Sequence, residues 1–215
     1  MNVRDVMTWN VVTVPSDTPI MEARKVMETH NILRMPVVDR GKLIGMVSRE
    51  RVVRAGPSSA TSLSAWELNY LVAKMQVKEI MIKDITTVSP TTTVEKAVAL
   101  AQNKKVGALP VVDNGKLVGI VTTNDFFYKI LNPILGIGFP GSRIIIFKAA
   151  NPKGLQDISE TLKKLNLKMV TMHQGPPFQG EEDAIYIQID TTDPGFIKEM
   201  STRGYKAELL ERNIA

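Results

Sequence analysis

The chain has 215 residues and a net charge of +5 at neutral pH, with 44% hydrophobic and 23% charged residues. This length allows one or two domains of about 100–200 residues, and the composition is that of a folded globular protein rather than a disordered chain. The chain has no cysteine and only two histidines, His30 and His173, which excludes disulfides, thiolate nucleophiles and cysteine-based metal sites. We therefore expect no catalytic residues and no metal site.

Hydropathy and charge indicate where the protein works. No apolar run approaches the ~18 residues of a membrane span, and the N-terminus lacks the basic and then apolar pattern of a signal peptide. A cytoplasmic protein without a membrane partner is the expectation. Residues 1–135 hold 17 Lys and Arg against 12 Asp and Glu, whereas residues 136–215 hold 10 of each. The excess of positive charge predicts an anionic ligand or partner for the first two-thirds of the chain.

An internal repeat organises that part of the chain. Residues 3–53, shifted by 74 positions, align with residues 77–127 without a gap and with 15 of 51 positions identical. The identical positions are densest in residues 36–47 and 110–121, where Pro-Val-Val-Asp-x-Gly-Lys-Leu-x-Gly-x-Val occurs twice. Two copies of one supersecondary unit are the simplest explanation.

Each copy predicts the same elements in the same order. A β-rich run opens the first copy at residues 11–14, and apolar residues at helical spacing follow at 20–27 and, in the second copy, at 94–101. Two apolar runs joined by Asp-x-Gly predict a β-hairpin. Ser48 and Thr122 are good N-caps for a final short helix. Each copy therefore reads strand–helix–strand–strand–helix.

These copies resemble the cystathionine-β-synthase (CBS) domain family. The family opens with Val-x-x-Val/Ile-Met, found at residues 3–7 and 77–81, and closes with Gly-apolar-apolar-Ser/Thr-x-x-Asp, intact at 119–125. The resemblance implies an α/β (α+β) fold with CBS domain 1 at 1–56 and CBS domain 2 at 77–132. Residues 57–76 would form a linker and a helix that the capping box Ser64 to Glu67 opens.

The C-terminal third predicts a different domain. Residues 133–142 form a Gly- and Pro-rich linker, and its Gly-x-Gly-x-x-Gly lacks the preceding strand that a dinucleotide-binding turn requires. Residues 143–215 then predict strand 143–149, helix 155–165, strands 168–173 and 184–189, helix 196–203 and strand 205–210. This is the ferredoxin-like βαββαβ order.

That order, with the turn after its first strand, resembles the ACT domain, an effector-sensing module. The possible effector turn consists of Asn151, Pro152, Lys153, Gly154 and Leu155. The family pattern is Asp-x-Pro-Gly-apolar-Leu, and here Lys153 stands at the glycine position with Gly154 one place later. Amino-acid binding therefore stays open. The CBS–CBS–ACT order also resembles the acetoin-utilisation family of regulatory proteins.

In CBS pairs the nucleotide lies between the repeats, so the resemblance implies two clefts. The first cleft would contain Thr8, Val11, Val12, Ile32, Leu33, Arg34, Met35, Pro36, Thr122, Asn124 and Asp125. A carboxylate such as that of Asp125 can accept hydrogen bonds from both ribose hydroxyls, and Arg34 can pair with phosphate. The alternative is that Thr122 and Asp125 only cap the start of their helix.

The second cleft would contain Ser48, Arg51, Ile82, Ile85, Val106, Gly107, Ala108 and Leu109. Arg51 stands where the ribose-binding Asp is expected and has no acceptor for the hydroxyls. This cleft is therefore predicted to be degenerate, either empty or suited to a more phosphate-rich anion through Arg49, Arg51 and Arg54. We expect about one adenine-nucleotide site per chain.

The sequence thus favours a regulatory protein that is not an enzyme and has no catalytic cofactor. It would sense AMP, ADP, ATP or S-adenosylmethionine in the CBS cleft, and the ACT-like domain would add dimerisation or a second effector site. A homodimer and an unidentified protein target are expected from the resemblance. The alternative is a nucleic-acid-associated or partner-binding structural protein that uses the basic CBS surface, since the isoelectric point is about 9.4.

Overall fold

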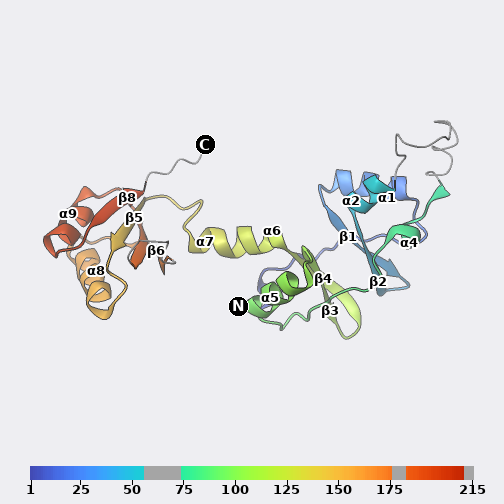
Figure 1. Ribbon diagram of the computed structural model, residues 1–215, viewed down its shortest axis with the longest axis horizontal. Helices are drawn as coiled ribbons and strands as arrows, with labels where there is room; N and C mark the ends of the chain where they lie inside the picture. Colours follow the sequence, from blue (N-terminus) through green and yellow to red (C-terminus); the bar gives the residue numbers. More distant parts are fainter. Residues whose placement is uncertain (56–73, 176–182, 211–215) are drawn as a thin grey trace. The chain divides into compact units, whose positions relative to one another are not determined.

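The computed structural model describes residues 1–55, 74–175 and 183–210, which fall into two compact units, Met1–Phe126 and Phe127–Ala215 (Figure 1). The linker and capped helix are predicted at residues 57–76. Residues 57–73 of this segment lie outside the described residues. Each unit is described separately.

Unit 1 contains both copies of the repeat. Its elements are η1 (Val3–Asp5), α1 (Ile20–Thr29), β1 (Arg34–Asp39), β2 (Lys42–Ser48), α2 (Arg49–Arg54), α4 (Val77–Ile80), α5 (Val94–Lys104), β3 (Ala108–Asp113), β4 (Lys116–Thr122) and α6 (Thr123–Phe126). Each copy contributes one antiparallel hairpin, β1–β2 or β3–β4, flanked by a longer helix and a short one. The predicted helix–hairpin–helix part of each copy is confirmed.

The two hairpins share one register because they share one turn. In the first, Asp39 pairs with Lys42 around a two-residue turn in which Arg40 and Gly41 have φ of 49° and 78°. Positive φ at both central positions is the type I′ geometry that matches the twist of the flanking strands. The carboxylate of Asp39 does more than shape the turn, since it accepts hydrogen bonds from the amide and hydroxyl of Ser16 at 2.9 and 2.6 Å.

The strand predicted at residues 11–14 is wrong. Only Val14 pairs, through an isolated parallel bridge with Val37, and Val88 makes the equivalent bridge with Val111 in the second copy. Of residues 11–14 only Val14 is buried, whereas the three before it are partly or fully exposed. Only this one residue is packed against β1, so the bridge between Val14 and Val37 does not extend into a strand.

Each copy is completed by the opening segment of the other copy. Val77 is fully buried in the first copy's core beside Met35 and Val37, with Ile80 and Met81 packed against the same cluster. Conversely, the amide of Val3 donates to the carbonyl oxygen of Thr92 at 2.8 Å. The family-like openings at residues 3–7 and 77–81 therefore lie in the half to which they do not belong in sequence.

Two glycine–methionine contacts mark this exchange. A Cβ added at Gly45 would lie 2.5 Å from the Met81 sulfur, and one added at Gly119 would lie 2.6 Å from the Met7 sulfur. Both glycines occupy the same position of the repeat, in β2 and β4. A glycine is needed there because the methionine of the exchanged segment lies directly on the strand backbone.

Gly45→Ala should lower the free energy of unfolding of unit 1 by about 1–3 kcal/mol, because the added methyl group overpacks the contact. Denaturant unfolding of the full chain measures this change. In a Met81→Ala background the same Gly45→Ala change should cost less, since the obstructing sulfur is gone. Equal costs in both backgrounds would show that the contact does not constrain the strand.

Unit 2 is built on one four-stranded sheet. Its elements are the π-helical turn η2 (Phe127–Leu131), α7 (Asn132–Ile134), β5 (Ser142–Phe147), α8 (Pro152–Lys164), β6 (Met169–Gln174), β7 (Ala184–Ile189), α9 (Pro194–Thr202) and β8 (Ala207–Leu210). The strand order is β6-β7-β5-β8, with every neighbouring pair antiparallel. Helices α8 and α9 lie on one face of this sheet (Figure 1), over a core that includes Ile144, Ile187 and Phe196.

The element order of unit 2 is the predicted βαββαβ order, with shifted boundaries. Helix α8 begins three residues before the expected start, because the Asn151 side chain accepts a hydrogen bond from the Gly154 amide at 2.9 Å and Pro152 fits the first turn. The expected linker begins inside α7. The last glycine of this segment, Gly141, serves packing, since a Cβ there would collide with the carbonyl oxygen of Ile189.

Ionic contacts join the exposed sides of α8 and α9. The carboxylate of Asp157 accepts hydrogen bonds from Lys153, Tyr205 and Arg203, each at 2.8 Å, and Arg203 also contacts Glu160 at 2.8 Å. The hydrogen bond from Lys153, followed by those from Tyr205 and Arg203, lowers the pKa of Asp157 from 3.8 to about 2. The network therefore favours the ionised carboxylate.

The stability of unit 2 should fall as the pH drops from about 4 to about 2. The pKa of Asp157 is about 2 in the folded state against an ordinary 3.8, so its contribution is present above pH 3.8 and is lost as the carboxylate protonates. In calorimetry, Asp157→Asn should melt below the native chain at pH 6, and the difference should shrink strongly by pH 2 and vanish below it. Glu208→Gln, which removes a carboxylate paired with a single exposed lysine, is the control. A difference that persists unchanged at pH 2 would contradict this account.

Candidate functional site

The first cleft is defined by Thr122 and Asp125 at the start of α6. The Asp125 carboxylate accepts hydrogen bonds from the Thr122 amide at 2.8 Å and from its hydroxyl at 2.7 Å. The Thr122 hydroxyl in turn accepts from the Asp125 amide at 3.3 Å. This reciprocal capping fixes the orientation of the carboxylate. Asp125 as a whole is buried, with only 9% of its surface exposed. The capping alternative is thus present in the structure, and it holds the Asp125 carboxylate in a defined orientation.

The other residues predicted for the first cleft are only partly brought together. Thr8 pairs with Ile120, two residues before Thr122 on β4, through hydrogen bonds of 2.9 and 3.0 Å. Val12 and Ile32 pack together against the first copy's core. The remaining residues divide by exposure: Leu33, Arg34 and Asn124 are exposed, Met35 and Pro36 are buried, and Val11 is intermediate.

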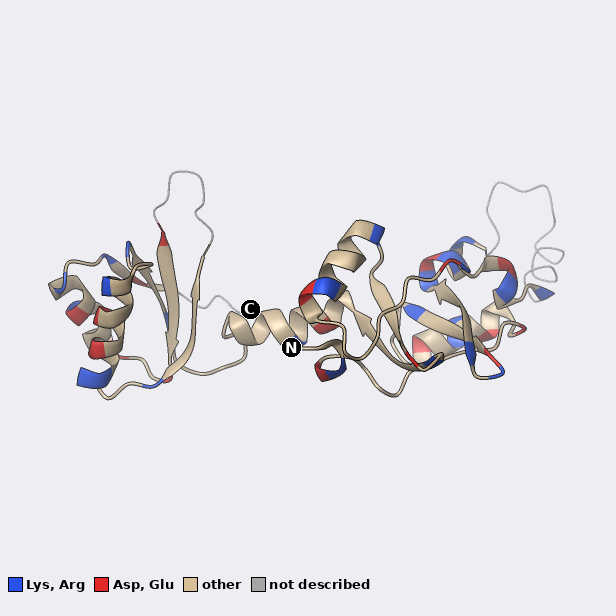
Figure 2. Ribbon diagram, turned by 90° about the horizontal axis from the view of Figure 1, so that it is seen from below, with Lys and Arg blue, Asp and Glu red and all other residues tan. Residues whose placement is uncertain are grey.

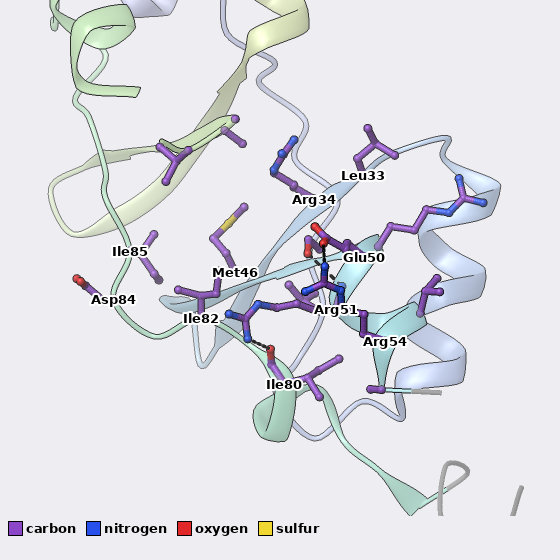
Figure 3. Close-up of a pocket in the computed structure, with 18 of the residues that line it drawn as sticks. Leu33, Arg34, Met46, Glu50, Arg51, Arg54, Ile80, Ile82, Asp84 and Ile85 are labelled. Carbon is purple, nitrogen blue, oxygen red and sulfur yellow. Dashed lines mark hydrogen bonds and ion pairs between the residues drawn. The ribbon is translucent and has the colours of Figure 1, made fainter. Parts of the chain in front are cut away.

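The second cleft contains a cavity of about 1310 Å³ (Figure 3). Seven of the eight residues predicted for it line this cavity: Ser48, Arg51, Ile82, Ile85, Val106, Gly107 and Ala108. Leu109 does not, because it alternates to the inner side of β3 and is buried in the core with 1% of its surface exposed. The cavity is larger than the roughly 300–1,000 Å³ typical of small-molecule sites.

The motif that closes the first copy has the same cap but a different side chain. Ser48 accepts a hydrogen bond from the Arg51 amide at 3.3 Å, as Thr122 does from Asp125. Among the residues that the structure describes, no carboxylate is hydrogen-bonded to this cap. Instead the Arg51 guanidinium donates to the carbonyl oxygen of Ile80 at 3.2 Å, along one wall of the cavity (Figure 3).

Arg34 lies at the second cleft, where it lines the cavity. Its guanidinium nitrogens would lie 2.7 and 2.9 Å from a Cβ at Gly107. The side chain therefore crosses from β1 to the start of the second copy's hairpin (Figure 3). Sequence reasoning placed Arg34 in the first cleft because its neighbours Ile32 and Met35 belong to the first copy's adenine pocket by resemblance.

The cavity also has residues that sequence reasoning did not assign to a cleft. These are Met46, Val47, Glu50, Val53, Ala55, Met75, Glu79, Ile80, Asp84, Thr86 and Lys105, whereas Leu33, like Arg34, was predicted for the first cleft. Lys105 was within reach of the sequence argument, since it directly precedes Val106 and ends α5 in the left-handed conformation at φ 52°. The acidic residues gave no signal, because no family motif specifies an acidic residue at these positions: Glu50 and Glu79 occupy variable positions of the motifs.

Charge in the second cleft is predominantly positive. Of the described residues that line the cavity, five are basic, Arg34, Arg49, Arg51, Arg54 and Lys105, and three are acidic, Glu50, Glu79 and Asp84. Figure 2 shows Lys and Arg concentrated on the first copy, at the right of the view. In the part of the chain that the structure describes, no group of three or more His, Cys, Asp or Glu residues could hold a metal ion. Nor does any described helix have the length and apolar composition to cross a membrane.

The possible effector turn of unit 2 uses its polar groups locally. The Asn151 side chain accepts from the Gly154 amide and donates to the carbonyl oxygen of Lys148 at 2.8 Å, while Lys153 is paired with Asp157. Gly154 is buried, and a Cβ there would lie 2.3 Å from the carbonyl oxygen of Ala149. The glycine therefore allows α8 to pack on the preceding backbone.

Known proteins resemble the chain over unit 1. Inosine-5'-monophosphate dehydrogenase of Korarchaeum cryptofilum is 35% identical over 125 residues, which are 58% of this chain and 23% of that protein. The CBS domain-containing protein YhcV of Bacillus subtilis is 30% identical over 124 residues, 58% of this chain and 81% of YhcV. The chain spans less than a quarter of the length of the dehydrogenases it matches first.

Solved structures share this part of the fold. The acetoin utilization protein AcuB from Vibrio cholerae matches with a TM-score of 0.52 and 31% identity, over 61% of this chain and 91% of AcuB. A crystal structure of CBSX2 in complex with AMP matches with a TM-score of 0.50 and 28% identity, over 61% of this chain and 96% of CBSX2.

The family model for the CBS domain matches residues 3–58 and again residues 77–132. These two matches cover more than half of the chain and coincide with the two copies of the repeat. With the paired hairpins and the capped closing helices of unit 1, they show that the chain belongs to the CBS domain family as a tandem pair.

Proposed function

We propose that the chain is a regulatory protein, without catalytic activity of its own, that binds an adenine nucleotide in the first cleft. The observation that carries the proposal is the Asp125 carboxylate, oriented by two hydrogen bonds from Thr122 at the start of α6. A carboxylate held in this way can accept hydrogen bonds from vicinal ribose hydroxyls. The structure of the related CBSX2 with AMP supports AMP as the ligand to test first.

Regulation would follow from the exchanged segments of unit 1. Thr8 is hydrogen-bonded to Ile120 on β4, and the adjoining Met7 lies on Gly119. A nucleotide that contacts Thr8 and the α6 cap would therefore affect how the two copies pack against each other. It can shift the equilibrium between two arrangements of the copies only by the difference in its affinity for them.

We further propose that unit 2 is an ACT-like domain that adds dimerisation or a second effector site. Its βαββαβ order, its β6-β7-β5-β8 sheet and the turn before α8 support the assignment. The local bonding of Asn151 and the Lys153–Asp157 ion pair favour the dimerisation role over amino-acid binding at this turn. A homodimer and a regulated protein target belong to the same proposal.

Asp125→Asn should weaken AMP binding at least about tenfold, because it removes a charged hydrogen-bond acceptor. Asparagine keeps one oxygen that can accept from the Thr122 amide, so the helix cap and the fold should survive. Calorimetric titration of the full chain with AMP measures the affinity and the stoichiometry, which we expect to be one per chain.

Thr93→Ala is the matched control, since it removes the N-cap of α5 without touching the cleft. It should lower the melting temperature and leave AMP affinity unchanged. Unchanged AMP affinity in Asp125→Asn would refute the proposed role of the carboxylate. Tight binding of a single-stranded oligonucleotide, with steep salt dependence and no response to Asp125→Asn, would instead favour the nucleic-acid alternative.

A further inference from the structure

We propose that the second cleft is a polyphosphate site, which binds a chain of two or more phosphoryl groups and does not read ribose hydroxyls. The site is separate from the proposed AMP site, because it is built around Arg51 rather than Asp125. It therefore adds a second ligand class to the same unit.

The repeat provides the internal comparison. Under the shift of 74 residues, the basic positions Arg34, Arg49, Arg51, Arg54 and Lys105 of the second cleft correspond in sequence to Ala108, Thr123, Asp125, Tyr128 and Asn31. Every cation of the second cleft thus has an uncharged or acidic counterpart. The hairpin residues 36–47 and 110–121 between these positions are the most similar part of the two copies.

The cations are not all neutralised by the protein. Arg54 pairs with Glu50 at 2.7 Å, and one nitrogen of Arg51 donates to the backbone at Ile80. Within the described part of the chain, Arg34 and Lys105 form no ion pair. Clustered cations repel one another, and an anion between them relieves the repulsion. Guanidinium groups bind phosphate oxygens through two parallel hydrogen bonds, which suits Arg34 and Arg51 to adjacent phosphoryl groups.

The second cleft lacks the carboxylate that would bind ribose hydroxyls. Arg51 occupies the position of the ribose-binding carboxylate and offers donors only. At this position a ligand gains from its phosphates, and its 2'-hydroxyl finds no side-chain acceptor. The remaining wall is apolar, with Ile82, Ile85 and Val106 beside Met46, and the cavity of about 1310 Å³ has room for a base as well. A nucleoside triphosphate and an inorganic polyphosphate share the chemistry that the cations recognise.

The test uses magnesium-free calorimetric titrations of the full-length Asp125→Asn variant, in which the proposed AMP site is weakened. Inorganic tripolyphosphate, ATP, 2'-deoxy-ATP and AMP are the probes. We expect tripolyphosphate to bind, ATP and 2'-deoxy-ATP to bind with equal affinity, and AMP to bind at least about tenfold more weakly than ATP. ATP binding tighter than tripolyphosphate would identify a nucleotide as the ligand, and equal affinities would identify the phosphate chain alone.

Arg51→Gln and Arg34→Gln should each weaken tripolyphosphate binding at least about tenfold, whereas Lys42→Gln, an exposed cation outside the cavity, should not. Gly107→Ala keeps every charge but displaces the Arg34 guanidinium, so it should also weaken binding. In the native background, Arg51→Gln should leave AMP affinity unchanged, which separates this site from the proposed AMP site. Equal losses in Lys42→Gln, a preference for the ribonucleotide, or AMP binding as tight as ATP would overturn the proposal.

Discussion

Unit 1 depends on one steric constraint, the seating of a methionine on a glycine across the two copies. Gly45 faces Met81 and Gly119 faces Met7, and in both places a single added carbon would collide with the sulfur. Around these contacts, Val77 enters the first core and Val3 hydrogen-bonds to the second copy. The close approach brings the closing motifs, the cap at Ser48 and the cap at Thr122, beside segments of the opposite copy. The cavity of the second cleft lies where this packing brings residues of the two copies together.

Local chemistry made the hairpins and caps predictable. Apolar runs around Asp-x-Gly, with a positive-φ pair at Arg40 and Gly41, specify a two-residue turn whatever surrounds it, and Ser48 caps the next helix by the same local logic. The prediction of a strand at residues 11–14 was wrong because β-propensity does not determine how many residues of a segment pair with a neighbouring strand. Only Val14 meets β1. The repeat itself gave no sign that the opening segments change places, since both halves offer the same apolar surface.

The cleft residues show the same limit. Seven of the eight predicted residues line the second cavity because a motif fixes their spacing. Arg34 lies there too, although its sequence neighbours belong to the other side, because an extended strand directs successive side chains to opposite faces. Met35 turns into the core and Arg34 turns out toward Gly107. Side-chain direction at the start of β1, and not the motif, decides which cleft receives the charge. In unit 2 the cap of α8 likewise shows that Asn151 and Gly154 serve packing.

The exchange of opening segments also bears on how such a module holds together. A polypeptide consisting of one copy alone would expose the core that Val77 covers, unless another molecule supplied the missing wedge. Such a half would have to assemble in pairs, each molecule lending its first residues to the other, and it would come apart on dilution. Fusing both copies into one polypeptide turns that encounter into an intramolecular event with a high effective concentration. The tandem arrangement therefore makes the assembly of the two halves independent of how much protein is present.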